Sequence, residues 1–151
     1  MQRYQSKFLI PLIKFNLPAE KAQYTAFPAK ILGELTDGQY PIVILSNGEP
    51  VSFFLLNSTD RVKKCTNNPT VFLLTALTID HSQQGRGFAK QGMYLLKDFV
   101  NREFPEYNEI VLTVNHKNIP AQKLYKRVGF IDTGKIKKGK IGKQLIFSTS
   151  V

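Results

Sequence analysis

A chain of 151 residues is long enough for one domain with a hydrophobic core, and its hydrophobic content of 42% is ordinary for a globular protein. Its apolar runs fall short of the roughly 18 residues that a membrane-spanning helix needs. Pro11 and Lys14 interrupt the N-terminal apolar stretch, so we expect no signal peptide. One cysteine, Cys65, excludes an internal disulfide and a cysteine-cluster zinc site. These features predict a cytoplasmic protein with one domain over residues 1–151.

The net charge of +10 is concentrated near the C-terminus. Residues 1–60 carry a net charge of 0, residues 61–114 of +2 and residues 115–151 of +8. Such a basic segment is typical of a chain that binds a polyanion, nucleic acid above all. A solvated basic face and a small, highly charged anionic cofactor bound near this end are the other two interpretations. Composition leaves all three open.

The first elements in chain order are a strand and two short helices. Residues 5–12, QSKFLIPL, are expected to form the strand. Residues 17–35 are expected to form the helices, divided at Pro28, because proline is tolerated in the first turn of a helix but not inside it.

A hairpin is predicted next, over residues 40–56. Its two β-rich runs flank Asn47-Gly48, and both residues accept the positive φ of a type I′ turn. Residues 60–69 predict a polar loop. The apolar run over residues 70–79 then predicts a strand that is covered on both faces.

A helix of about 14–16 residues should follow from Phe88, where apolar residues recur at helical spacing, and end before Pro105. Residues 109–114 predict the next strand, which should be parallel to the strand before the helix because a helical crossover joins them. A second short helix is expected between the N-cap Asn118 and Gly129.

Residues 130–136 and 143–150 predict two last strands around a basic turn. The order is therefore β-α-α-β-β-β-α-β-α-β-β. This is an α+β fold with one mixed central sheet flanked by helices.

The segment 81–93, HSQQGRGFAKQGM, joins a predicted strand to a predicted helix. Gly85 and Gly87 allow backbone N–H groups to approach a ligand, and the start of the helix adds the positive end of its dipole. Together they suit a pyrophosphate. The P-loop pattern does not fit, because Lys90 is followed by Gln91 where that pattern needs serine or threonine. The dinucleotide pattern does not fit either, because Lys90 stands where it needs a third glycine. A tight turn without a ligand is the alternative.

Two motifs in this chain carry a family resemblance. Gln84, Gly87 and Ala89 form Q-x-x-G-x-A, and residues 114–130 match V-x-x-x-N-x-x-A-x-x-L-Y-x-x-x-G-F. In this order and on these elements, they resemble the acyl-CoA pyrophosphate loop and the second signature of the GNAT superfamily of N-acetyltransferases. The sequence around these motifs is most similar to small bacterial members of the family, often of unassigned substrate, and has some likeness to the polyamine-acetylating branch.

The resemblance implies an enzyme of EC 2.3.1 type that moves acetyl from acetyl-CoA directly to a primary amine of a small molecule or peptide. Homodimers are common in the family. A non-catalytic acyl-CoA-binding protein and a basic nucleic-acid-binding module are the rival functions. We expect no metal and no membrane partner.

By resemblance, ten residues would contact the co-substrate. The strand segment Leu77, Thr78 and Ile79 would offer backbone hydrogen bonds to the pantetheine arm. The residues that would wrap the pyrophosphate are Gln84, Gly85, Arg86, Gly87, Phe88 and Ala89. Asn118 would contact the cofactor in addition to capping its helix. A plain core strand and a surface arginine are the alternatives for residues 77–79 and for Arg86.

Tyr125 is the catalytic residue that the resemblance implies. Attack of an amine on a thioester releases a thiolate, and a nearby phenol can donate the proton that this thiolate needs. The alternative is a core tyrosine, because Ala121, Leu124 and Val128 share its helix face.

No general base is identifiable from the residues. Residues 71–79 contain no acidic side chain, although many family members place one there. Asp80 lies at the end of this strand, His81 and His116 are candidates of low weight, and Thr75 could at best position a water molecule. This departure favours a water relay over direct base catalysis.

Overall fold

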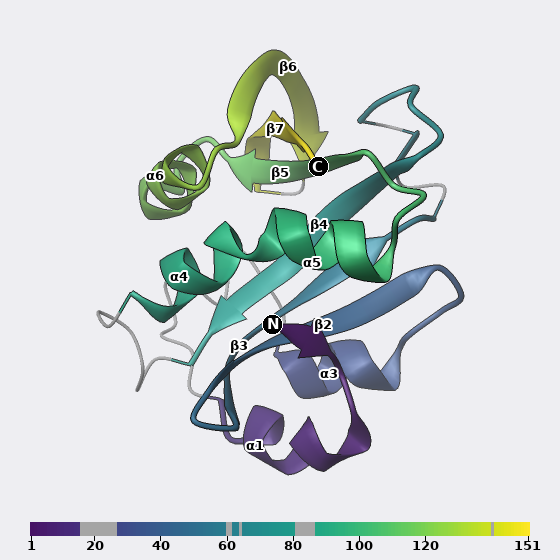
Figure 1. Cartoon of the computed structure of the whole chain (residues 1–151). Helices are drawn as coiled ribbons and strands as arrows, with labels where there is room; N and C mark the ends of the chain where they lie inside the picture. The colour runs from purple at the N-terminus through teal and green to yellow at the C-terminus, as the bar shows by residue number, and fades with distance from the viewer. Residues whose placement is uncertain (16–26, 60–61, 64, 81–86, 140) are drawn as a thin grey trace.

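One mixed β-sheet organises the structure (Figure 1). The computed structural model describes residues 1–15, 27–59, 62–63, 65–80, 87–139 and 141–151. In these residues seven strands follow one another across the sheet in the order β1-β2-β3-β4-β5-β7-β6. The strands are β1 (Gln2–Arg3), β2 (Gln39–Ser46), β3 (Glu49–Asn57), β4 (Val71–Ile79), β5 (Glu109–Asn115), β6 (Ile131–Gly139) and β7 (Gly142–Ser150). β4 and β5 are parallel, and the other neighbouring pairs are antiparallel.

Helices cover both faces of this sheet. They are α1 (Leu9–Ile13), preceded by the 3₁₀ turn η1 (Ser6–Phe8), α3 (Pro28–Gly33), α4 (Phe88–Tyr94), α5 (Leu96–Glu103) and α6 (Ile119–Arg127). On one face, α4, α5 and α6 bury a large core that includes Met93, Phe99 and Phe72. On the other face, α1 and α3 cover β2 and β3. The predicted α+β fold is therefore confirmed.

The hairpin and the cap of the last helix follow the sequence rules. β2 and β3 are joined at Asn47 and Gly48, whose φ angles are 51° and 79°. Asn118 caps α6 by accepting a hydrogen bond from the backbone amide of Ala121 at 3.4 Å. Gly129, directly after that helix, has a φ of 104°. These local predictions are confirmed.

The predicted strand over residues 5–12 is wrong. This segment forms η1 and α1, and the first strand is the short β1, which pairs with β2. Phe8, Leu12 and Phe15 are buried, a spacing of one helical face, and pack on β2 and β3. The helical period therefore prevails over the β-like composition.

The long helix predicted after the glycine turn is divided into two. α4 and α5 meet at Leu95, whose amide bonds to the carbonyl of Gly92, three residues back. Such tightening into a 3₁₀ turn is common at helix ends. Of the two helices predicted over residues 17–35, α3 begins at Pro28 as expected, and residues 17–26 lie outside the described ranges.

Candidate active site

The site forms where the two parallel strands β4 and β5 part. Their pairing runs from Val71 and Glu109 to Leu74 and Leu112 and then stops. A bulge lies just beyond, because the register of β3 against β4 shifts and Ala76 adopts a φ of 61°. A bulge bends a strand and increases its twist, so it directs the end of β4 away from β5.

The end of β4 offers unpaired backbone groups on its β5 side. Thr78 accepts a hydrogen bond from the Ser52 hydroxyl at 2.7 Å, and the amide of Asp80 donates to Val51 at 3.1 Å, so both residues point toward β3. Because backbone groups alternate in direction along a strand, Leu77 and Ile79 point the other way. There, no described strand pairs with them. An extended, amide-bearing ligand could add to this edge.

Gly87 marks the start of α4, shortly after β4 in the chain. It has a φ of 74° and is the N-cap of α4, and a Cβ there would meet nothing within 4 Å. Its carbonyl accepts from the amide of Gln91 at 2.9 Å. Phe88 and Ala89 begin the helix, where the first N–H groups have no partner within the helix. Gln84, Gly85 and Arg86 lie outside the described residues.

Asn118 stands where β5 has ended and α6 begins. Its side-chain oxygen is occupied by the cap to Ala121. Its amide nitrogen Nδ2 makes no hydrogen bond to the part of the chain that the structure describes. The cap and the predicted ligand contact are therefore compatible, because they use different atoms.

Tyr125 lies on the inner face of α6, with 7% of its surface exposed. Its ring packs edge-on against Phe130, with centroids 5.8 Å apart, and Leu77 of β4 packs against the same core cluster. Burial raises the pKa of the phenol well above its usual value, so the hydroxyl keeps its proton at neutral pH.

The Tyr125 hydroxyl has no hydrogen bond to the described residues. Both interpretations of Tyr125 fit this placement, since its ring belongs to the core and its hydroxyl is not engaged by another residue of the described ranges.

A network of polar side chains lies on the sheet face opposite α6 and ends at Thr75, one residue before the bulge at Ala76. Gln39 Nε2 donates to Asn57 Oδ1 at 3.0 Å, and Asn57 Nδ2 donates to Thr75 Oγ1 at 2.9 Å. Asn57 is fully buried, and its other Nδ2 hydrogen goes to the carbonyl of Leu73. Sequence reasoning missed Gln39 and Asn57; the signal was a polar residue closing the apolar run of β3.

Two of the residues considered as bases, His116 and Asp80, lie within the described residues. Exposed His116 contacts the carbonyl of Lys143 through Nδ1, at 3.0 Å. Asp80 directly follows β4, and His81 lies outside the described residues. The described ranges hold no group of three or more side chains suited to a metal ion, and none of their helices is long and apolar enough to cross a membrane.

The fold is that of an N-acetyltransferase of the GNAT type, and comparison with known proteins shows the family. The acetyltransferase (GNAT) family matches residues 9–130. A protein of Bacillus subtilis (strain 168), described as uncharacterized N-acetyltransferase YbbJ, is 39% identical over 146 residues, which are 95% of this chain and 91% of that protein. The chain belongs to the GNAT family of acetyltransferases.

Solved structures share the fold. Aminoglycoside acetyltransferase AAC(6')-Ib in complex with coenzyme A and kanamycin aligns with a TM-score of 0.77 at 16% identity, over 99% of this chain and 92% of that one. A chimera of spermidine N-acetyltransferase SpeG from Vibrio cholerae and hSSAT aligns with a TM-score of 0.69 at 16% identity, over 99% and 94% of the two chains. At these identities the likeness concerns the fold alone.

Proposed function

We propose that this protein transfers acetyl from acetyl-CoA directly to the primary amine of a small molecule or peptide. The observation that carries the proposal is the unpaired β4 edge at Leu77 and Ile79, where Leu77 packs against the same core cluster as Tyr125. Family membership supports acetyl transfer, and fold relatives named for aminoglycosides and spermidine support a small-molecule amine.

The described residues fit coenzyme A. The free edge of β4 suits the amide groups of a pantetheine arm, and Gly87 leaves open space where the pyrophosphate would lie. Asn118 has its Nδ2 group available as a further donor. Arg86, Gln84 and Gly85 complete the proposed loop in sequence. When bound, acetyl-CoA supplies an acetyl group activated as a thioester.

Tyr125 is the proposed general acid. As the new carbon–nitrogen bond forms and the carbon–sulfur bond breaks, the phenol gives its proton to the departing sulfur. The raised pKa keeps that proton available at neutral pH. The nitrogen of the new amide releases its surplus proton to solvent, and solvent returns one proton to the phenol oxygen.

Thr75 is the proposed anchor of a water relay. Its oxygen accepts a hydrogen bond from Asn57 Nδ2, which can only donate, so the hydroxyl hydrogen of Thr75 must point elsewhere. Thr75 is half-buried and lies one residue before the bulge at Ala76. A water held there can take the proton of the incoming ammonium and pass it to bulk solvent.

Thiol release from acetyl-CoA with a panel of amines tests the function. The panel covers polyamines, amino acids, peptide N-termini and aminoglycosides, and each product is identified by mass. We expect release that depends on at least one amine and yields its acetylated form. Binding of acetyl-CoA without turnover on the whole panel would favour a sensor. Salt-sensitive oligonucleotide binding without affinity for CoA would favour a nucleic-acid-binding module.

A matched pair of glycine substitutions tests the phosphate loop. Gly87→Glu places a carboxylate at the proposed pyrophosphate site and should abolish CoA binding in calorimetry. Gly48→Glu is the control, because Gly48 has a similar φ of 79° and equally open surroundings in the β2–β3 turn. Equal CoA affinity of the two variants would refute the loop assignment.

A further inference from the structure

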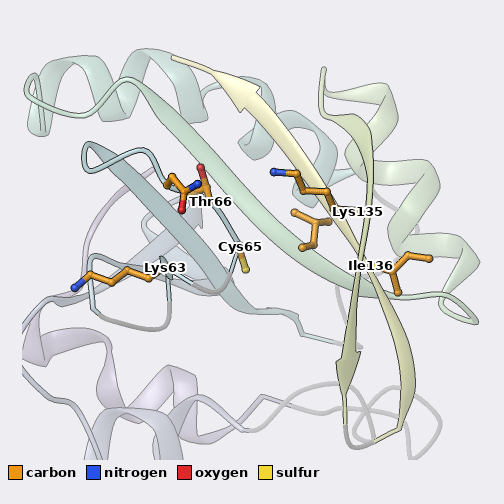
Figure 2. Close-up of a pocket in the computed structure, with 7 residues that line it drawn as sticks. Lys63, Cys65, Thr66, Lys135 and Ile136 are labelled. Carbon is orange, nitrogen blue, oxygen red and sulfur yellow. The ribbon is translucent and has the colours of Figure 1, made fainter.

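A hollow of about 410 Å³ opens on the sheet face opposite α4 (Figure 2). One wall is the segment that carries Lys63, Thr66 and Asn67, and the other is β6 with Lys135. Buried Ile146 of β7 forms the floor. The first wall is held in place because Val62 and Cys65 pack on this face against Leu73, Val111 and Ile146.

A bulge in β6 builds the second wall. Asp132 and Ile136 pair with Phe147 and Leu145, so β6 has three intervening residues where β7 has one, and it arches away from the sheet (Figure 1). The Thr133 hydroxyl donates to the carbonyl of Ile146 at 2.7 Å and accepts from the amide of Lys135 at 3.2 Å.

The same bulge directs Lys135 into the hollow. Gly134 supplies the turn with a φ of 80°, and its amide bonds to Asp132 Oδ1 at 2.9 Å. Figure 2 shows the Lys135 side chain extending from β6 toward the segment with Thr66. Lys135 forms no ion pair with the described part of the chain. A bulge that aims a side chain in this way is typical of a functional position.

The lining of the hollow is rich in hydrogen-bond donors. Thr66 Oγ1 accepts from the amide of Asn68 at 3.2 Å, which leaves its own hydrogen to be donated. Asn67 adds a side-chain amide, and Lys135 adds an ammonium. No carboxylate lines the hollow among the described residues. This chemistry favours an anionic group and disfavours a second ammonium.

The hollow lies close to the proposed reaction point. Its floor residue Ile146 pairs with Thr113 of β5, one residue beyond the last pair between β5 and β4. Thr75 lies across β5, on the same face as Ile146, since it alternates with Leu73 in the cluster that contains Ile146. Two strand spacings, roughly 10 Å, are the least that separates Thr75 from Ile146, because β4 parts from β5 beyond Leu74.

We propose that the amine acceptor carries a carboxylate or phosphate group at least roughly 10 Å from its amine, and that Lys135, with Thr66 and Asn67, binds this group. The inference rests on the proposed function, and it names the substrate class: an amine with an acidic far end, in contrast to a polycation. It also gives a role to Lys135, a residue of the basic C-terminal segment that the proposed binding of coenzyme A does not use.

Kinetics with matched amines test the proposal. The amines are linear ω-amino carboxylic acids of increasing length, the amides of the same acids, and aminoalkyl phosphates. At the best length, kcat/KM for the acid should exceed that for its amide by about tenfold or more, the contribution of a charged hydrogen bond. The phosphate series distinguishes the two anions. Equal rates for acids and amides at every length would overturn the proposal.

Two lysine variants distinguish binding of the anion by Lys135 in this pocket from a general attraction by positive charge. Lys135→Gln should raise KM for the acids to that of the amides while leaving the rate with the amides unchanged. Lys138→Gln removes the same charge from the same strand, but its register partner is Lys143 and it alternates to the other face, so the acid preference should persist. An equal loss in both variants would refute the pocket.

Binding of simple anions tests the site without turnover. Titration of the isotope-labelled protein with propionate and with inorganic phosphate should give saturable shifts at the amides of Thr66 and Lys135, and Lys135→Gln should abolish them. Unshifted amides would overturn the inference even if acetyl transfer is observed. Acetylation of no amine, with these shifts present, would instead refute the proposed function.

Discussion

Asn57 Nδ2 donates a hydrogen bond to Thr75 Oγ1 at 2.9 Å and so ties the end of β3 to β4 one residue before the bulge at Ala76. Because the Thr75 oxygen accepts this bond, its hydroxyl hydrogen points away from Asn57. In the proposed relay, Thr75 therefore holds the water on another side of its oxygen.

Thr75→Val should lower kcat by about tenfold, the low end of the contribution of assisted proton transfer. Valine keeps the shape but cannot hold the water. The deficit should shrink as the pH rises toward the amine pKa of about 10, because the free amine needs no relay. Thr75→Ser is the control and should retain most of the rate. Identical pH–rate profiles for the valine and serine variants would remove Thr75 from the mechanism.

Tyr125→Phe should reduce kcat at least tenfold, on the order of the effect of a general acid, with KM for acetyl-CoA near that of the parent. Tyr94→Phe is the matched control, since it also deletes one hydroxyl from a helix but that group is exposed and bonds to the carbonyl of Arg127. An unchanged kcat in Tyr125→Phe would leave Tyr125 as a core residue.

The buried phenol of Tyr125 should also make stability pH-dependent. Its pKa is raised in the folded chain, so below about pH 10 both states hold the proton and the free energy of unfolding is unaffected. Above that pH the unfolded chain releases the proton first, and stability falls by up to about 1.4 kcal/mol per pH unit.

Urea unfolding of the parent and of Tyr125→Phe, from about pH 8 to about pH 11, measures this effect against the tyrosine reference pKa. The other tyrosines contribute equally to both proteins, so the difference isolates Tyr125. We expect the parent to lose stability relative to the phenylalanine variant above pH 10. Parallel curves would mean that the phenol is not buried as described.

Gly92→Ala should destabilise the packing of α4 on β2. A Cβ at this position would lie 2.6 Å from Ile44 Cδ1 and 2.8 Å from Ile44 Cγ2. Overpacking of this kind costs about 1–3 kcal/mol. Gly33→Ala is the control, because a Cβ there meets nothing within 4 Å, and it should be neutral or slightly stabilising. Urea denaturation measures both, and equal midpoints would contradict the close contact.

Much of the fold follows from local sequence rules. The turn at Asn47-Gly48 and the cap at Asn118 depend on residues close in sequence, and the parallel β4–β5 pair follows from the helical crossover between its strands. The structure confirms all three. The strand prediction for residues 5–12 is wrong. In a short run with both β-type composition and helical spacing, the surface on which the run packs determines its secondary structure. For Phe8 that surface is the face of β2 and β3.

Only part of the candidate site could be predicted from the sequence. The loop and Tyr125 belong to motifs of fixed spacing, so they could be proposed as site residues without coordinates. Asn57 and Lys135 act across strands that are distant in the chain, and their roles depend on register and on the bulges at Ala76 and Gly134. No pattern within one segment indicates such pairings.

Single-turnover transfer of an isotope-labelled acetyl group tests the central claim most directly. The protein is mixed with labelled acetyl-CoA and an accepted amine, and label is followed by mass in the amine and in the protein chain. Direct transfer predicts one labelled amine for each thiol released and no label bound to the protein. Label on the protein chain, or thiol release without labelled amine, would contradict it.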